Sequence, residues 1–457
     1  MQPQSIDLNA DLGEGFPHDA ELMQIVTSAN ICSGAYIPND EPVKAALALA
    51  KAHDVRVGIH VGYPDVEGFG RTSNFMSPAE FKVALDEQVD SFLVLAKAAG
   101  VEVKYLKPHG ALYHDLIPQS ELWTIILRVC FKHDWSVVHL AGSNFLKLAA
   151  EGIGTIHEGF VDRRYESTKQ LLARDQKGAV LQDEAEVLAQ AKSLVKGRLK
   201  LNDGRVVSSK VNSLCLHGDT PGAVQMGGSV RRGLLSEGFE LAPYERITLH
   251  PYGPKSCIVR VHEEPSYELT KRLNIAEIAF KELPFIIETR TSYNELLLRS
   301  KYDIDLEFVL AHSHKAFSVP QGMVFFTGPR NHEIWTSYIG PDLDFVSSKT
   351  GLSKAEIIHL HTQKTYTVYA LGFQPGFAFL GALPFELQLP RKSVPRDRVP
   401  PNSVAIAADQ TAIYPHASPG GWHLIGVAEA PIFDPESPTL CPFKPGDTVQ
   451  FKDISTR

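Results

Sequence analysis

Residues 105–110 read YLKPHG, so a short apolar run ends in Lys107, His109 and Gly110. Three other runs end in a similar way: IDLNAD at residues 6–11, VGIH at residues 57–60 and CLHGD at residues 215–219. In βα folds the carboxyl ends of the strands meet on one face, and that face carries the chemistry. The four endings therefore predict a parallel sheet with a site at one end.

The rest of the first half alternates strand and helix signals. Apolar runs predict buried strands at residues 6–10, 55–59, 103–106, 137–141 and 214–216, and amphipathic segments predict helices at 41–53, 77–93 and 183–197. Ser77 and Glu80 form a capping-box pattern around Pro78, which marks a helix start. We expect an α/β fold with a mostly parallel sheet, either open or closed into a barrel.

The pattern changes at residues 250–254, HPYGP, which indicate a domain boundary. Strand signals follow at residues 256–261 and 285–290, on either side of a predicted helix at 268–283, and a further helix is predicted at 353–361. From Tyr366 onward short apolar runs are broken by Gly and Pro, which favours an all-β or barrel-like domain.

Composition limits the class of protein. The 457 residues suggest about two to four domains, and the net charge of −8 gives no general attraction to nucleic acid or to an anionic membrane. No segment approaches the roughly 18 apolar residues that span a bilayer, and the start lacks the basic region of a secretory signal peptide. The five cysteines contain no CxxC pair, so we expect a reduced, cytoplasmic protein without a disulfide framework or thiolate zinc site.

The strand endings carry groups suited to proton transfer and charge stabilisation, since they combine imidazole, ammonium and carboxylate groups. A loop at Gly68–Arg71 adds a guanidinium suited to a carboxylate or phosphate, with a surface turn as the alternative. Asp162–Tyr165 and Arg174 allow the same two interpretations.

Seven stretches of the first half resemble the LamB/YcsF family, which supplies the A-type subunit of bacterial ATP-dependent 5-oxoprolinase. They are DLNADLGEG (7–15), SANICSG (28–34), GIHVGYPDVEGFGR (58–71), LKPHGALYH (106–114), EGFVDRRY (158–165), LLARDQKGAV (171–180) and LHGDTPGAV (216–224). The resemblance implies a seven-stranded deacetylase-like β/α barrel.

The second half resembles the B-type subunit of the same enzyme, which is related to one half of allophanate hydrolase. The matching stretches are GPDLDFVSSKTGLS (340–353), residues 356–381, LPRKSVPRDRVPPNSVAIA (389–407), IYPHASPGGWHLIG (413–426) and FKPGDTVQF (443–451). The resemblance implies a fusion with a barrel at residues 1–252, a small α/β domain at 253–338 and a cyclophilin-like β-barrel at 339–457. It also implies a separate partner that resembles the C-type subunit of that enzyme.

The substrate implied by the resemblance is 5-oxoproline, opened to L-glutamate with ATP and Mg²⁺. An unactivated lactam is a poor electrophile, and phosphorylation of its oxygen would activate the ring carbon toward water. We expect Asp11 or His60 to be the base, Lys107 and His109 to stabilise negative charge, and Arg71 to bind the substrate carboxylate. Asn9, Glu14, His217 and Asp219 would shape the pocket.

One position departs from the family pattern. Where relatives carry a His in a Cys-Gly-Phe-His-Ala-Gly-Asp stretch, this chain has Tyr36. If that His binds a divalent metal with Asp11 and His60 in relatives, only two ligands remain here, and two rarely hold a catalytic ion. The sequence therefore leaves the metal unassigned.

The ATP site also stays open, because the chain contains no GxxxxGK[ST] motif. Glycines and cationic or aromatic residues of the second half are the candidates, with barrel turns as the alternative explanation. These residues are His361, Gly376, Arg391, Arg396, Tyr414 and Trp422.

Two other functions fit parts of the sequence. One is a metal-dependent deacetylase on the same barrel, which Tyr36 disfavours; the other is a non-catalytic binding protein like the kinase inhibitors that resemble the second half. Allophanate hydrolysis normally needs a Gly- and Ser-rich amidase signature, which we do not find. The oligomeric state stays open, with a homo-oligomer among the alternatives.

Overall fold

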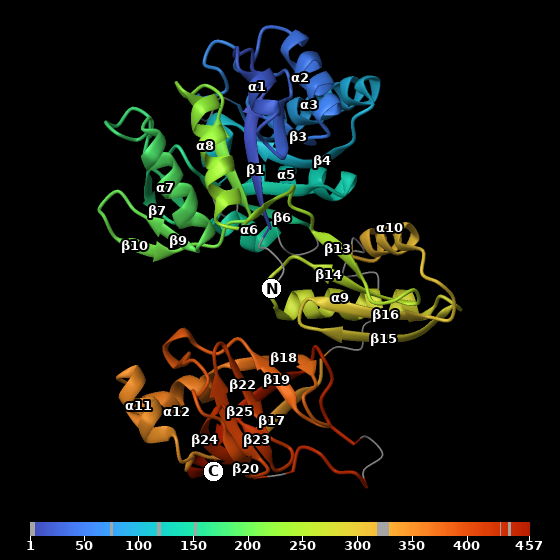
Figure 1. Cartoon of the computed structure of the whole chain (residues 1–457), viewed down its shortest axis with the longest axis vertical. Coiled ribbons are helices and arrows are strands. Elements are labelled where there is room, and N and C mark those ends of the chain that lie inside the picture. Colours follow the sequence, from blue (N-terminus) through green and yellow to red (C-terminus); the bar gives the residue numbers. More distant parts are fainter. Residues whose placement is uncertain are drawn as a thin grey trace. The chain divides into compact units, whose positions relative to one another are not determined.

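The computed structural model describes residues 5–73, 76–116, 120–149, 153–317, 329–429, 431–436 and 440–457. The chain divides into two compact units, residues 1–246 and residues 247–457 (Figure 1). No helix in the described ranges is long and apolar enough to cross a membrane.

The first unit is built on a closed barrel of seven parallel strands. In barrel order these are β1 (Ser5–Leu12), β2 (Ser28–Cys32), β3 (Arg56–Val61), β4 (Val103–Pro108), β5 (Ser136–Leu140), β6 (Thr155–Phe160) and β11 (Ser213–His217). β11 pairs with β1 and closes the barrel, with Asp11 opposite His217. The prediction of an α/β fold with a mostly parallel sheet is confirmed. The sheet is closed into a barrel and not open.

Helices surround this barrel (Figure 1). They are α1 (Asp19–Met23), α2 (Glu41–His53), α3 (Pro78–Ala99), α4 (Gly110–Asp115), α5 (Glu121–His133), α6 (Asn144–Ala149), α7 (Glu184–Val195) and α8 (Ala223–Ser236). The predicted capping box is present at α3, where the Ser77 side chain accepts from the Glu80 backbone. α3 buries Phe81, Leu85 and Phe92. Short ladders β7 (Tyr165–Ser167) with β8 (Gln170–Leu171) and β9 (Arg198–Lys200) with β10 (Val206–Ser208), and the strand β12 (Glu240–Leu241) beside β1, complete the unit.

The second unit begins with a four-stranded antiparallel sheet. Its order is β13 (Ile247–Pro251), β14 (Ser256–Val261), β16 (Glu295–Ser300) and β15 (Ile286–Ser292), with helices α9 (Tyr267–Lys281) and α10 (Leu306–Phe317). The units separate after Arg246, slightly before the boundary expected after residue 252, because β13 pairs with β14.

A second closed barrel of seven strands follows. Its order is β17 (Asn331–Ser337), β24 (His423–Ala428), β21 (Ser403–Ala407), β22 (Gln410–Ile413), β19 (Ala378–Gly381), β18 (Thr365–Leu371) and β25 (Thr448–Asp453). Helices α11 (Leu343–Thr350) and α12 (Lys354–Gln363) belong to this part, as does the ladder of β20 (Arg396–Val399) with β23 (Ser418–Gly420). The predicted barrel-like signature from Tyr366 onward is therefore confirmed.

Candidate active site

Ionisable side chains from five strands meet inside the carboxyl end of the first barrel. They are Asp11 of β1, His60 of β3, Lys107 of β4, Glu158 of β6 and Cys215 of β11. All five side chains are buried. The structure thus brings together the predicted Asp11, His60 and Lys107, and it adds Glu158 and Cys215.

Lys107 lies at the centre of this cluster and is only 1% exposed. Its ammonium Nζ is 2.7 Å from Asp11 Oδ1, 2.8 Å from Glu158 Oε1 and 3.2 Å from Cys215 Sγ. Burial alone would lower the pKa of Lys107, but the negative charge of Asp11 and its other neighbours holds that pKa well above the usual range. Lys107 is therefore a permanent cation whose charge is matched by two carboxylates.

Asp11 is held as a carboxylate by the same contacts. Burial alone would raise the pKa of Asp11, but the Lys107 ammonium and the His60 imidazole hold it well below its usual range. Asn30 of β2 also donates from Nδ2 to Asp11 Oδ1 at 2.8 Å. A carboxylate stabilised in this way is a weak base, which makes Asp11 better suited to positioning its neighbours than to accepting a proton.

His60 and His109 point their rings at each other, with Nε2 of His60 3.0 Å from Nδ1 of His109. His109 follows β4 directly, as the cap of α4. Glu14, which follows β1, places its Oε1 3.2 Å from the same Nδ1 and 3.7 Å from Nε2 of His60. Burial lowers the pKa of His109 despite the Glu14 carboxylate, which favours the neutral ring.

Tyr36 packs directly against this group. Its ring stacks on His109 with centroids 3.9 Å apart, and its hydroxyl donates to Glu14 Oε1 at 3.2 Å. The side chain is completely buried, and burial raises the pKa of its phenol well above the usual range. Tyr36 is therefore a neutral hydrogen-bond donor that fixes the position of Glu14.

A histidine–aspartate pair lies at the end of β11. Nδ1 of His217 is 3.0 Å from the Asp162 carboxylate, which also accepts from the His217 backbone N–H at 3.1 Å and from Thr220 Oγ1 at 2.9 Å. Burial alone would raise the pKa of Asp162, but His217 and these donors lower it. Because Asp162 holds the Nδ1 proton, the lone pair of His217 lies on Nε2.

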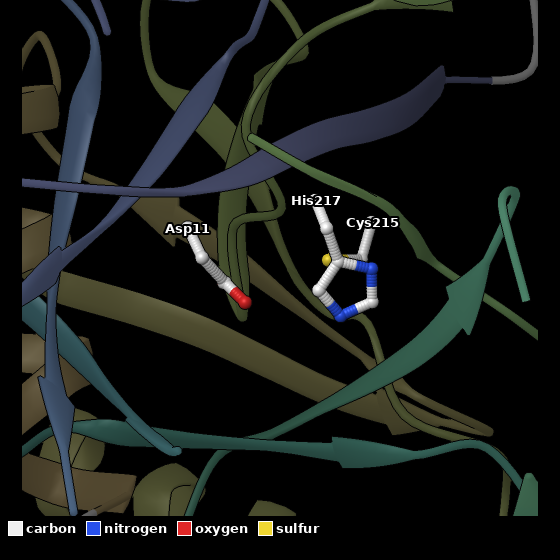
Figure 2. A group of neighbouring side chains, drawn as sticks. All are labelled: Asp11, Cys215 and His217. Atoms are coloured by element: carbon white, nitrogen blue, oxygen red, sulfur yellow. The ribbon is translucent and has the colours of Figure 1, made fainter. Parts of the chain in front are cut away.

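His217 is better exposed than the lysine cluster, and its ring stacks on Phe160 with centroids 5.1 Å apart. Figure 2 shows the side chains of Cys215 and His217 next to each other, with Asp11 nearby. An imidazole with one nitrogen bonded to a carboxylate and the other available is the arrangement of a general base.

Two guanidinium groups lie beside this pair. Asp219 Oδ2 accepts from Arg71 Nη2 at 2.9 Å and from Arg174 Nη1 at 2.8 Å. Burial alone would raise the pKa of Asp219, but Arg174, His217 and Arg71 lower it. Both arginine side chains are partly exposed, so this cationic rim can contact an anionic ligand.

Asn9 lies deeper in the barrel than its predicted pocket-shaping role requires. Its Nδ2 donates to Ser213 Oγ at 2.7 Å, and its Oδ1 accepts from Asn30 at 2.7 Å. Asn9 is 2% exposed and supports Asn30, which in turn holds Asp11. Its part in the site is to position other side chains.

The residues predicted for nucleotide binding occupy different settings in the second unit. Tyr414 and Trp422 are buried around Phe377, and the exposed Arg391 guanidinium lies 5.8 Å from the centre of the Trp422 ring. Arg396 donates to Asp342 Oδ1 at 2.6 Å. Nucleotide binding by this group stays a prediction.

Gly376 and His361 lie in more enclosed surroundings. Gly376 has φ of +83°, and a Cβ built there would come within 2.7 Å of the Phe433 side chain. His361 is completely buried in the second barrel, where Nδ1 accepts from Tyr338 at 2.7 Å and Nε2 donates to Thr411 Oγ1 at 2.9 Å. His361 therefore presents no surface to a phosphate in this structure.

Sequence reasoning missed Glu158 and underrated Asp162. Thr155–Phe160 forms a strand, and Glu158 within that strand could have indicated the ion cluster. A carboxylate buried inside a barrel needs a cationic partner. Asp162 belongs to a predicted loop, and its pairing with His217 depends on β6 and β11 lying side by side.

Two groups of donor atoms among the described residues have the composition of a metal site: Glu14 with His60 and His109, and Asp11 with Cys215 and His217. The second group already contacts the Lys107 ammonium through Asp11 and Cys215. Burial also raises the pKa of the Cys215 thiol well above the usual range, which disfavours the thiolate that binds metals. Among the described residues, no Lys or Arg side chain forms an ion pair with the donor atoms of the first group.

The two halves match different domain families. The LamB/YcsF family matches residues 6–249, and the family described as carboxyltransferase domain, subdomain C and D, matches residues 247–443. The chain is 37% identical over 243 residues to the A subunit of 5-oxoprolinase from Neisseria meningitidis serogroup A, covering 52% of this chain and 99% of that protein. It is 36% identical over 251 residues to the A subunit of 5-oxoprolinase from Pyrococcus horikoshii, covering 53% and 98%. Among solved structures, the lactam utilization protein from Thermus thermophilus is 32% identical with a TM-score of 0.49, covering 53% of this chain and 100% of that one.

Proposed function

Because the chain belongs to the LamB/YcsF family through residues 6–249, we propose that it opens the lactam ring of 5-oxoproline to give glutamate. Relatives that match nearly over their whole length are named as the A subunit of 5-oxoprolinase. The observation that carries the proposal is the His217–Asp162 pair beside the Lys107 cluster at the strand ends. This is the donor and acceptor set that hydrolysis of an activated cyclic amide requires.

The proposal includes ATP and a further protein. The chain combines a LamB/YcsF domain with a carboxyltransferase C/D domain, which is consistent with a fusion of an A-type subunit to a B-type subunit of the kind that resembles kinase inhibitors. Relatives named as one subunit of 5-oxoprolinase imply an enzyme of several chains. We therefore expect a separate protein of the C type to complete the enzyme, with ATP and Mg²⁺ as co-substrate.

ATP supplies the activation that a lactam lacks. In the proposed reaction the lactam oxygen takes the γ-phosphoryl group and ADP leaves, so the ring carbon becomes electrophilic. Water then adds to this carbon and the carbon–nitrogen bond breaks with a proton delivered to nitrogen, which leaves an acyl phosphate. A second water hydrolyses this acyl phosphate to glutamate and inorganic phosphate. The chain's own residues have to remove a proton from water, hold the substrate carboxylate and match the negative charge that develops.

His217 is the base in this proposal, in place of the Asp11 or His60 expected from sequence. Its Nε2 lone pair is set by Asp162, whereas the Asp11 carboxylate is bound to Lys107 and Asn30. Asp162 would stabilise the imidazolium that forms when His217 accepts the proton. Lys107 would stabilise the negative charge that develops, as expected from the sequence, and Asp11 would hold Lys107 in position.

Arg71 and Arg174 bind the substrate carboxylate in this proposal. Both already pair with Asp219, and both are partly exposed at the rim. A substrate carboxylate would share or replace the Asp219 contact, which explains why two guanidiniums surround a single aspartate oxygen.

The test is reconstitution with purified components. The full chain alone with 5-oxoproline, ATP and Mg²⁺ is expected to release almost no glutamate, and addition of a C-type partner protein is expected to give glutamate and ADP together. Glutamate release without ATP, or no release by the mixture when each protein is folded, would contradict the proposed function.

A further inference from the structure

Three ligand atoms converge at one point beside the lysine cluster. Nε2 of His60 and Nδ1 of His109 are 3.0 Å apart, and Oε1 of Glu14 is 3.2 Å from the second and 3.7 Å from the first. A point equidistant from all three lies about 1.9 Å from each, close to the 2.0–2.2 Å that zinc keeps from nitrogen and oxygen ligands. An ion just outside the plane of the three atoms therefore fits without moving them.

The other nitrogen of each ring is already committed to the backbone. Nδ1 of His60 lies 3.1 Å from the carbonyl oxygen of Lys107, and Nε2 of His109 lies 3.0 Å from that of Phe69. A carbonyl oxygen only accepts, so these two nitrogens carry the protons and the facing nitrogens carry lone pairs. Two lone pairs and a carboxylate repel one another unless a cation lies between them.

Metal-binding histidines commonly donate from the ring nitrogen that does not bind the metal to a backbone carbonyl, which fixes the orientation of the ring. Tyr36 adds to this support by stacking on His109 and donating to Glu14. All the supporting contacts come from different loops and strands, so the convergence is a property of the folded barrel.

From this geometry we infer that Glu14, His60 and His109 bind one divalent transition-metal ion. Two imidazoles and one carboxylate suit zinc, cobalt, manganese or iron(II) better than magnesium or calcium, which prefer oxygen ligands. The inference does not depend on the identity of the substrate.

The experiment uses the full chain, freed of metal by a chelator and then titrated with Co²⁺ or Zn²⁺ in the absence of any substrate. Wild type is expected to take up one ion per chain, measured by elemental analysis, and Co²⁺ is expected to give visible ligand-field bands. Glu14→Gln, His60→Gln and His109→Gln are each expected to weaken binding at least about tenfold.

His53→Gln is the matched control, because His53 is an exposed histidine at the end of α2. This variant is expected to bind the ion as wild type does. Circular dichroism checks folding, and the Glu14→Gln variant, which keeps the shape of the side chain, decides the case if a histidine variant does not fold.

Two results would overturn the inference: no ion bound by folded wild type, or wild-type affinity in a folded Glu14→Gln chain. If no ion binds, the short distance between His60 Nε2 and His109 Nδ1 reflects a proton shared by the two rings. Failure of glutamate release in the reconstituted enzyme leaves the metal result standing, since binding is measured without substrate or partner.

Discussion

His217 and Asp162 lie 55 positions apart in the sequence, yet Nδ1 of the histidine is 3.0 Å from the carboxylate of the aspartate. The contact exists because β6 and β11 are parallel neighbours, with Cys215 opposite Phe160. Both residues follow the last paired position between these two strands, so the pairing of β6 with β11 brings them together. The pair then fixes which nitrogen of His217 can accept a proton.

Lys107→Met tests the buried ion cluster. Removing the ammonium leaves Asp11 and Glu158 buried without their cation, so the free energy of unfolding is expected to fall by about 3–5 kcal/mol. Urea denaturation followed by circular dichroism measures the change. Lys104→Met on the same strand is the control, since Lys104 pairs with Glu102 at the surface and is expected to cost less than about 1 kcal/mol. Equal effects of the two substitutions would refute the special role of Lys107.

Arg174→Gln tests the cationic rim. Loss of this guanidinium is expected to raise the KM for 5-oxoproline about 10- to 100-fold and to change kcat much less, because the contact is to a part of the substrate that does not react. Steady-state kinetics of the reconstituted enzyme measures both constants. Arg128→Gln is the control, because Arg128 forms an exposed pair with Asp86. An unchanged KM for Arg174→Gln would remove Arg174 from the substrate site.

His361→Gln tests a pH dependence of the second barrel. Burial lowers the pKa of His361 to about 3, whereas an unfolded chain has its histidines near 6.5. The neutral buried ring therefore contributes stability that is fully present above pH 6.5. As pH falls from 6.5 toward 3, the unfolded state takes up the proton first, and this contribution declines by about 1.4 kcal/mol per pH unit.

The measurement is the free energy of unfolding at pH 7 and pH 5 for wild type and variant. His361→Gln is expected to lower stability at pH 7 and to lose part of the decline toward pH 5. His359→Gln on the exposed side of the same helix is expected to keep the wild-type slope. The same slope in the His361→Gln chain would show that this ring does not control the acid response.

Local signals of the sequence identified much of the fold. The capping box of Ser77 with Glu80 and the helix at Glu41–His53 occur as expected, because both depend on neighbouring residues. The strands β2 and β6 were not predicted. Ser28 and Asn30 interrupt the first and Glu158 the second, and these polar side chains face partners inside the barrel that only folding brings near.

The sequence could predict which strand ends contribute side chains to the site, but not how those side chains contact one another. The gathering of Asp11, His60 and Lys107 follows from parallel strands sharing one end. The protonation pattern of His60 and His109 does not, because it is set by backbone carbonyls of other loops. The family resemblance drew attention to Tyr36, but it could not show that the tyrosine hydroxyl contacts Glu14.

The most direct test of the central claim is the single-turnover rate of glutamate formation by the reconstituted enzyme carrying Asp162→Asn. Loss of the carboxylate that orients His217 is expected to slow the reaction about 10²- to 10⁴-fold, as is His217→Gln, while the exposed Asp86→Asn leaves the rate unchanged. If folded Asp162→Asn and His217→Gln enzymes both turn over at the wild-type rate, ring opening does not take place at these strand ends.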